Sequence, residues 1–106
     1  MRILVVTAHP DDVDFGAGGS VATWTRDGHE VVYCLVTDGQ AGGFDNSIPR
    51  DDMTAIRRRE QTEAAAILGV TELHFLGFPD GAVVADLNLR REISAVIRKV
   101  KPDRVV

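Results

Sequence analysis

Short apolar runs alternate with stretches of helical periodicity along the chain. The runs 3–7, 30–37 and 73–76 are rich in β-forming residues, and the first of them, Ile3 to Thr7, is typical of a strand buried on both faces of a parallel sheet. Segments 15–27, 52–68 and 87–101 repeat apolar residues at helical spacing. Arg104 to Val106 begins a fourth apolar run. Strands that alternate with helices join through right-handed crossovers, so the pattern predicts an α/β fold with a mostly parallel sheet.

The length and the final run bear on the domain organisation. A chain of 106 residues is enough for one small domain with one core. We therefore expect a single domain over residues 1–106. The fourth apolar run stops after Val106, before a full strand is formed, so we expect this domain to be truncated at its C-terminal side.

Charge and hydropathy narrow the classes of partner. The net charge of −4 argues against a nucleic-acid or anionic-membrane surface, because either partner attracts a basic face. No apolar run approaches the roughly 18 residues of a membrane span, and no signal peptide is evident. Cys34 is a lone cysteine in an apolar run, which suits a small buried side chain and a reducing compartment. We expect a cytoplasmic protein, and a homo-oligomer is compatible with the sequence.

Two helical segments have predicted buried faces. In segment 87–101 the residues predicted to face the core are Leu89, Ile93, Val96, Ile97 and Val100. In 52–68 they are Met53, Ile56, Ala64, Ile67 and Leu68, and Arg57 and Glu60 fall on or beside this stripe. Charges on a core-facing stripe are costly unless they are paired or lie near a site. Arg57 therefore either faces a functional pocket or forms an intrahelical ion pair with Glu60.

A cluster of metal-ligand residue types follows the first predicted strand. His9, Asp11, Asp12 and Asp14 fall within six positions, at the end of a strand where α/β sheets bind ligands. Carboxylates so close together repel one another unless a positive charge lies among them, and His and Asp are normal zinc ligands. A tight turn would aim His9 and Asp12 at one ion and leave Asp11 beside it as a general base. The alternative is ordinary turn and helix-capping chemistry.

The other histidines are poor candidates for a metal site. His29 precedes the second strand and so belongs to the opposite edge of the sheet, whereas His74 lies within the third strand. Asp80, in a Pro-Asp-Gly loop, suits either a hydrogen bond to a sugar hydroxyl or plain turn chemistry.

The chain resembles the LmbE-like, or PIG-L, N-deacetylase family in an ordered series of motifs. The first and most specific is Ala8-His9-Pro10-Asp11-Asp12 after an apolar strand. The others are Gly16 to Gly19, Thr37-Asp38-Gly39, Arg57-Arg58-Arg59-Glu60, Leu68-Gly69-Val70 and Leu76-Gly77-Phe78-Pro79-Asp80-Gly81. Together they cover nearly the whole chain.

The resemblance implies a Rossmann-like three-layer fold with zinc, or another divalent metal such as Fe²⁺, at the carboxyl edge of the sheet. It implies His9 and Asp12 as metal ligands, Asp11 as general base and Arg57 in the substrate pocket. The implied reaction is removal of an N-acetyl group from an N-acetylglucosamine-containing small molecule, as in mycothiol-pathway deacetylases and related amidases. A third ligand, a histidine, is expected beyond residue 106. The family's acidic residue after the paired aspartates is Val13 here, with Asp14 one place later.

Two other functions are compatible with the sequence. Gly16-Ala17-Gly18 before a helix and Asp38 twenty residues later suit a nucleotide-binding Rossmann module, although Asp11 and Asp12 would repel a pyrophosphate. A non-catalytic half-domain that needs a missing segment or a partner chain is the second alternative.

Overall fold

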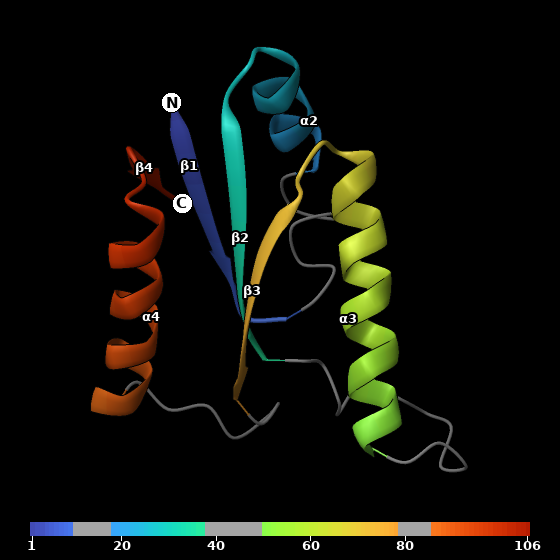
Figure 1. Cartoon of the computed structure of the whole chain (residues 1–106), viewed down its shortest axis with the longest axis vertical. Helices are drawn as coiled ribbons and strands as arrows, with labels where there is room; N and C mark the ends of the chain where they lie inside the picture. Colours follow the sequence, from blue (N-terminus) through green and yellow to red (C-terminus); the bar gives the residue numbers. More distant parts are fainter. Residues whose placement is uncertain (10–17, 38–49, 79–85) are drawn as a thin grey trace.

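The computed structural model describes residues 1–9, 18–37, 50–78 and 86–106 (Figure 1). Along the chain these residues form β1 (Arg2–Thr7), α2 (Gly18–Arg26), β2 (Glu30–Thr37), α3 (Arg50–Ile67), β3 (Glu72–Phe78), α4 (Leu87–Val100) and β4 (Arg104–Val105). The predicted alternation of strands and helices is confirmed. The predicted beginning of the first helix, at residue 15, lies outside the described residues.

The strands form a parallel sheet in the order β3-β2-β1-β4. β1 pairs with β2 along one edge and with β4 along the other, and β2 pairs with β3. The chain thus moves outward from β1 to β3 and then returns to the far side of β1. This reversal creates a topological switch point between β1 and β4, the place where open α/β sheets bind ligands beyond the carboxyl ends of the strands.

Helices cover both faces of the sheet, which makes the fold three-layered. Val21 of α2 and Ala65 of α3 belong to one apolar cluster, with strand residues that include Ile3 and Tyr33. Val96 and Val100 of α4 belong to a second cluster on the opposite face. Figure 1 shows α4 on one side of the strands and α3 on the other. Because side chains alternate along a strand, consecutive residues of β1 and β2 serve different clusters.

Two predicted core positions in the helices are wrong. In α3, Gln61 and Ala65 are fully buried, whereas Ile67 is 86% exposed. Ile67 follows Ala65 by two residues, a rotation of about 200° around the helix, so it faces away from the sheet. In α4, Val96 and Val100 are buried as predicted, but Ile97 is exposed, because the next residue along a helix turns about 100° away.

A β-bulge extends β3 beyond its predicted end at Leu76. Leu35 of β2 pairs with Phe75, and Thr37 pairs with Phe78, so one residue of β2 lies opposite two residues of β3. Gly77 lies within the bulge and has a φ of +74°, a conformation that glycine adopts without steric cost. The strand therefore continues through a glycine that sequence patterning treats as the start of a loop.

Arg2 ties together three elements at the amino edge of the sheet. Its guanidinium donates to the carboxylate of Glu30 at 2.9 and 3.1 Å and to the backbone oxygen of Val100 at the end of α4. Its backbone N–H donates to Asp103. The hydrogen bond from Arg2 lowers the pKa of Glu30 below its ordinary value. A guanidinium also interacts favourably with the carbonyl end of a helix.

Within the described parts of the chain, no helix has both the length and the apolar character needed to cross a membrane.

Candidate functional site

The turn after β1 is fixed at the carboxyl edge of the sheet by the last residue of β2. Ala8 offers its backbone oxygen to the N–H of Thr37 at 2.9 Å and to the Thr37 hydroxyl at 2.8 Å. The hydroxyl of Thr7 donates to the His9 backbone oxygen at 3.4 Å. Thr37 itself is only 1% exposed. His9 therefore directly follows a residue whose backbone oxygen is bound by a buried threonine of the neighbouring strand.

His9 occupies the position that the strand pattern predicts for a ligand-binding residue. It follows the carboxyl end of β1, beside the switch point with β4, and it is exposed. The predicted residues Asp11, Asp12 and Asp80 lie outside the described residues. Among the residues that are described, no three His, Cys, Asp or Glu side chains gather as a metal-binding group. The metal site thus stays a prediction in which His9 is the placed member.

Arg57 lies in the half of α3 nearer to the carboxyl edge of the sheet. α3 begins at that edge (Figure 1), and Arg57 follows its first residue by about 10 Å along the axis. The Arg57 guanidinium lies 3.7 Å from the Glu60 carboxylate, and its side chain is 28% exposed. The predicted intrahelical pair is therefore present. The next residue, Arg58, places its guanidinium 5.1 Å from the centre of the Phe75 ring, which links α3 to β3.

The remaining histidines and the cysteine lie elsewhere. His29, at the amino edge, accepts a hydrogen bond at its Nδ1 from the Met1 amino group at 3.2 Å. His74 lies on β3 with its Nε2 3.1 Å from the Glu72 carboxylate. Cys34 is fully buried, and burial raises the pKa of its thiol to about 11. Its predicted interpretation as a small buried side chain is confirmed.

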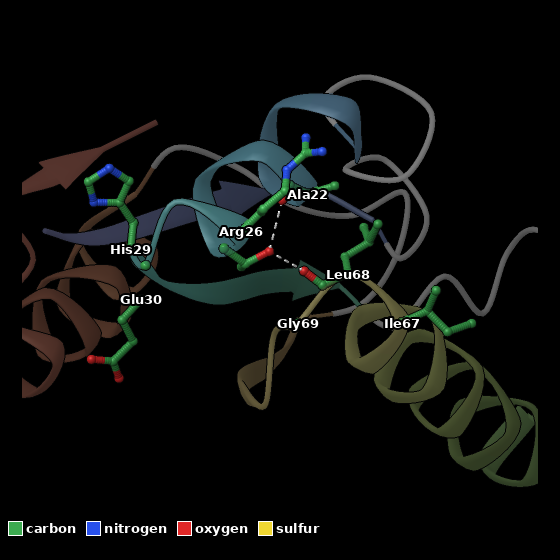
Figure 2. Close-up of a pocket in the computed structure, with 9 residues that line it drawn as sticks. Ala22, Arg26, His29, Glu30, Ile67, Leu68 and Gly69 are labelled. Carbon is green, nitrogen blue, oxygen red and sulfur yellow. Dashed lines mark hydrogen bonds between the residues drawn. The ribbon is translucent and has the colours of Figure 1, made fainter.

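A cavity of about 460 Å³ lies at the opposite, amino edge of the sheet, between the end of α2, the start of β2 and the end of α3. Figure 2 shows that the side chains of Arg26, His29 and Glu30 point in different directions rather than into a common space. The Thr25 hydroxyl donates to the Leu68 backbone oxygen at 2.6 Å and so ties α2 to the turn after α3. Because its charged groups do not converge, this cavity lacks the arrangement that a catalytic site needs.

Thr37 is a residue of the candidate site whose contact with Ala8 the residue patterns do not predict. It appears in the sequence only as the polar end of an apolar strand, within the motif Thr37-Asp38-Gly39. Its partner Ala8 lies 29 residues away, and the pairing of β1 with β2 brings the two together. One signal would have indicated this contact: a threonine ends a buried strand, and the neighbouring strand carries the predicted site.

The fold defines a class: a three-layer α/β domain in which the central strand β1 ends beside the topological switch point with β4. The model of the PIG-L family, described as GlcNAc-PI de-N-acetylase, matches residues 4–106, and the chain belongs to this family. The predicted LmbE-like resemblance is therefore confirmed.

Known relatives support this membership. The diacetylchitobiose deacetylase of Thermococcus kodakarensis is 37% identical over 105 residues, which cover 99% of this chain and 39% of that protein. The solved N,N'-diacetylchitobiose deacetylase from Pyrococcus horikoshii superposes with a TM-score of 0.94 at 35% identity, over 98% of this chain and 39% of that one.

A further solved structure extends the range of activities on this fold. GalB, the 4-carboxy-2-hydroxymuconate hydratase from Pseudomonas putida KT2440, superposes with a TM-score of 0.87 at 28% identity, over 98% of this chain and 45% of that one. The chain thus spans less than half the length of each of these three relatives.

Proposed function

We propose that the protein is a zinc-dependent hydrolase that removes the acetyl group from an N-acetylglucosamine-containing substrate. The observation that carries the proposal is the His9 turn, fastened by Thr37 at the carboxyl end of the central strand. It occurs in a chain whose family description is de-N-acetylase and which is 37% identical to a diacetylchitobiose deacetylase.

The residue types of the His9 turn fit a zinc ion. An exposed imidazole at the sheet edge is a normal zinc ligand, and Asp12, three residues later, offers a carboxylate. We propose that His9 and Asp12 hold the ion, with the third ligand outside this chain's described residues. Zinc, when bound, polarises a carbonyl and lowers the pKa of a water ligand to about 7. Fe²⁺ or another divalent ion is the alternative that metal analysis distinguishes.

The protein side chains would move protons and hold the sugar. Asp11 accepts a proton from the attacking water, whose oxygen forms a bond to the acetyl carbon. The C–N bond then breaks, and the proton passes to the departing nitrogen, which gives acetate and a free amine. Arg57 binds the substrate from α3, and Asp80 accepts a hydrogen bond from a sugar hydroxyl. Removal of either would mainly weaken substrate binding.

Acetate release by the intact protein tests the proposal. N-acetylglucosamine and N,N'-diacetylchitobiose are incubated with the protein before and after treatment with a chelator, and zinc content is measured in parallel. We expect chelator-sensitive release, and an Asp11→Asn variant that keeps its zinc but loses release. Asp27→Asn, at an exposed position after α2, is the matched control. Release that persists without metal contradicts the metal assignment, and loss of zinc from Asp11→Asn contradicts the general-base role.

A hydratase is the second candidate, because GalB shares the fold at 28% identity. Activated water would then add across a carbon–carbon double bond of a carboxylated substrate instead of cleaving an amide. The two reactions are separated by their products. Acetate release indicates a hydrolase, whereas loss of the ultraviolet absorbance of a conjugated carboxylate, without acetate, indicates a hydratase.

We also propose a cytoplasmic location, which the single cysteine supports. Assembly into a homo-oligomer stays a prediction, and light scattering of the purified protein tests it.

A further inference from the structure

β3 forms one edge of the sheet, and its outer side has no strand partner within the described part of the chain. The strand order places β3 last, next to β2 alone (Figure 1). Its backbone forms no hydrogen bond to a described backbone group outside the sheet. Residues 72–76 contain neither proline nor lysine, which commonly protect a sheet edge. Such an edge is a template on which another strand can pair.

The two faces of β3 differ in chemistry. Leu73 and Phe75 pack against the apolar cluster on the α3 face, and Leu76 packs against the cluster on the α4 face. Because side chains alternate along a strand, Glu72 and His74 share the α4 face with Leu76. The Nε2 atom of His74 lies 3.1 Å from the Glu72 carboxylate, and the His74 and Glu72 side chains are 18% and 45% exposed. A carboxylate and an imidazole therefore lie side by side on the edge strand.

A second copy of β3 can pair with this edge in the antiparallel direction, which is the direction that a two-fold axis through the sheet produces. Residues opposite each other then share a face, so only registers that differ by two residues keep Leu73 and Phe75 in the apolar layer. One such register places Glu72 opposite Glu72 of the second copy. The next places Glu72 opposite His74, and a third places it opposite Leu76. Like charges opposite each other destabilise a sheet, whereas opposite charges stabilise it, so the register that joins Glu72 to His74 is favoured.

The favoured register also joins apolar side chains. Leu73 then lies opposite Leu73 of the second copy, and Thr71 lies opposite Phe75. Aromatic and β-branched residues are favourable neighbours across a strand pair. The bulge at Gly77 confines the pairing to the residues before it, because a bulge disrupts the ladder. The amino half of β3 is therefore self-complementary in both charge and hydrophobicity.

We propose that β3 pairs with β3 of a second copy of this chain, so that two four-stranded sheets form one continuous sheet. This contact is independent of the proposed reaction and supplies an interface for a homo-oligomer. Antiparallel pairing points the carboxyl ends of the two sheets in opposite directions. In each copy β2 separates β3 from β1, so the two His9 turns lie at opposite ends of the joined sheet and away from the contact.

Sedimentation velocity of the intact protein over a concentration series tests this proposal. The double variant Glu72→Lys, His74→Lys places only cations at the contact, and His74→Glu places only carboxylates there. We expect each variant alone to have a dissociation constant at least about tenfold higher than that of the unmodified protein. An equimolar mixture of the two variants should associate again, because lysines then face carboxylates. Glu63→Lys, at an exposed position on α3, is the control for a change of net charge.

The mixture separates pairing between copies from an effect within one chain. Each variant keeps its like charges on its own strand after mixing, so only a contact between the copies can restore association. Recovery of association in the mixture supports the β3 contact. An unmodified protein that stays monomeric at every concentration overturns it, as does a dissociation constant that both variants leave unchanged. A mixture that associates no more tightly than either variant alone also overturns it.

Discussion

Replacing Thr37 with valine removes one buried hydroxyl and keeps the shape of the side chain. In the folded protein that hydroxyl donates to the Ala8 backbone oxygen at 2.8 Å, and Thr37 is 1% exposed. The Thr37 backbone N–H still donates to the same oxygen at 2.9 Å, so the carbonyl keeps a partner. The variant therefore loses one neutral hydrogen bond, and no buried acceptor is left without a partner. We expect the free energy of unfolding to fall by about 0.5–1.5 kcal/mol.

Urea denaturation of the purified variant measures this change. For a domain of this size, 1 kcal/mol corresponds to a fall of about 4–8 °C in Tm. Thr62→Val is the matched control, because its hydroxyl also donates to a backbone oxygen, that of Arg58 at 2.7 Å, but on the exposed surface of α3. If His9 binds zinc, Thr37→Val should also weaken zinc binding by about tenfold, because residues that orient a ligand tune metal affinity. Equal stability and equal zinc affinity in the two variants would refute the anchoring role of Thr37.

Three further perturbations follow from the described contacts. Gly69→Ala should destabilise the protein by about 1 kcal/mol or more in a thermal melt, because Gly69 has a φ of +86° and an added Cβ would lie 3.0 Å from Thr25. Gly19 has open space around it, so Gly19→Ala should be neutral or stabilising in the same measurement. The Cys34 thiol, with its pKa raised to about 11, should react with a thiol reagent at mildly alkaline pH only after unfolding in urea; rapid labelling of the folded protein would be inconsistent with its burial. Arg2 lowers the pKa of Glu30 from its ordinary value of 4.5, so the stabilisation by this pair is complete above pH 4.5 and is lost as the pH falls through the folded-state pKa. In an acid titration, the free energy of unfolding should therefore fall more steeply for the unmodified protein than for Glu30→Gln. Parallel curves for the two proteins would contradict this.

The strands near the centre of the fold were predictable because the residues between their polar ends form continuous apolar runs. β1 and β2 are buried on both faces, and a continuous apolar run is what such burial requires. The end of β3 was not predictable from local pattern, because Gly77 reads as a loop residue. Pairing of Phe78 with Thr37 across a bulge overrides that local preference. The helix faces were predicted in outline, and Ile67 shows that an apolar residue at the last position of a helix need not face the core.

The candidate site was predictable where it depends on the end of a strand. His9 follows an apolar run, and strand ends in parallel sheets meet at one edge, so its position follows from the sequence. The Thr37–Ala8 contact joins residues 29 positions apart, and its geometry exists only once β1 and β2 pair. Whether Arg57 turns toward Glu60 was also open, because an ion pair on a helix and a substrate contact need the same residue at the same spacing.

The pairing of β1 with β4 has a consequence for the protein while it is being synthesised. Ile3 pairs with Arg104, so one edge of the central strand waits for about 100 further residues to leave the ribosome, about 5–20 s at ordinary translation rates. During that interval β1 can pair with β2, but its other edge offers unsatisfied backbone groups to any passing strand. The pairing of β4 beside β1 is consequently among the last features to form, and a nascent chain held before residue 104 should engage chaperones more strongly than one released after it.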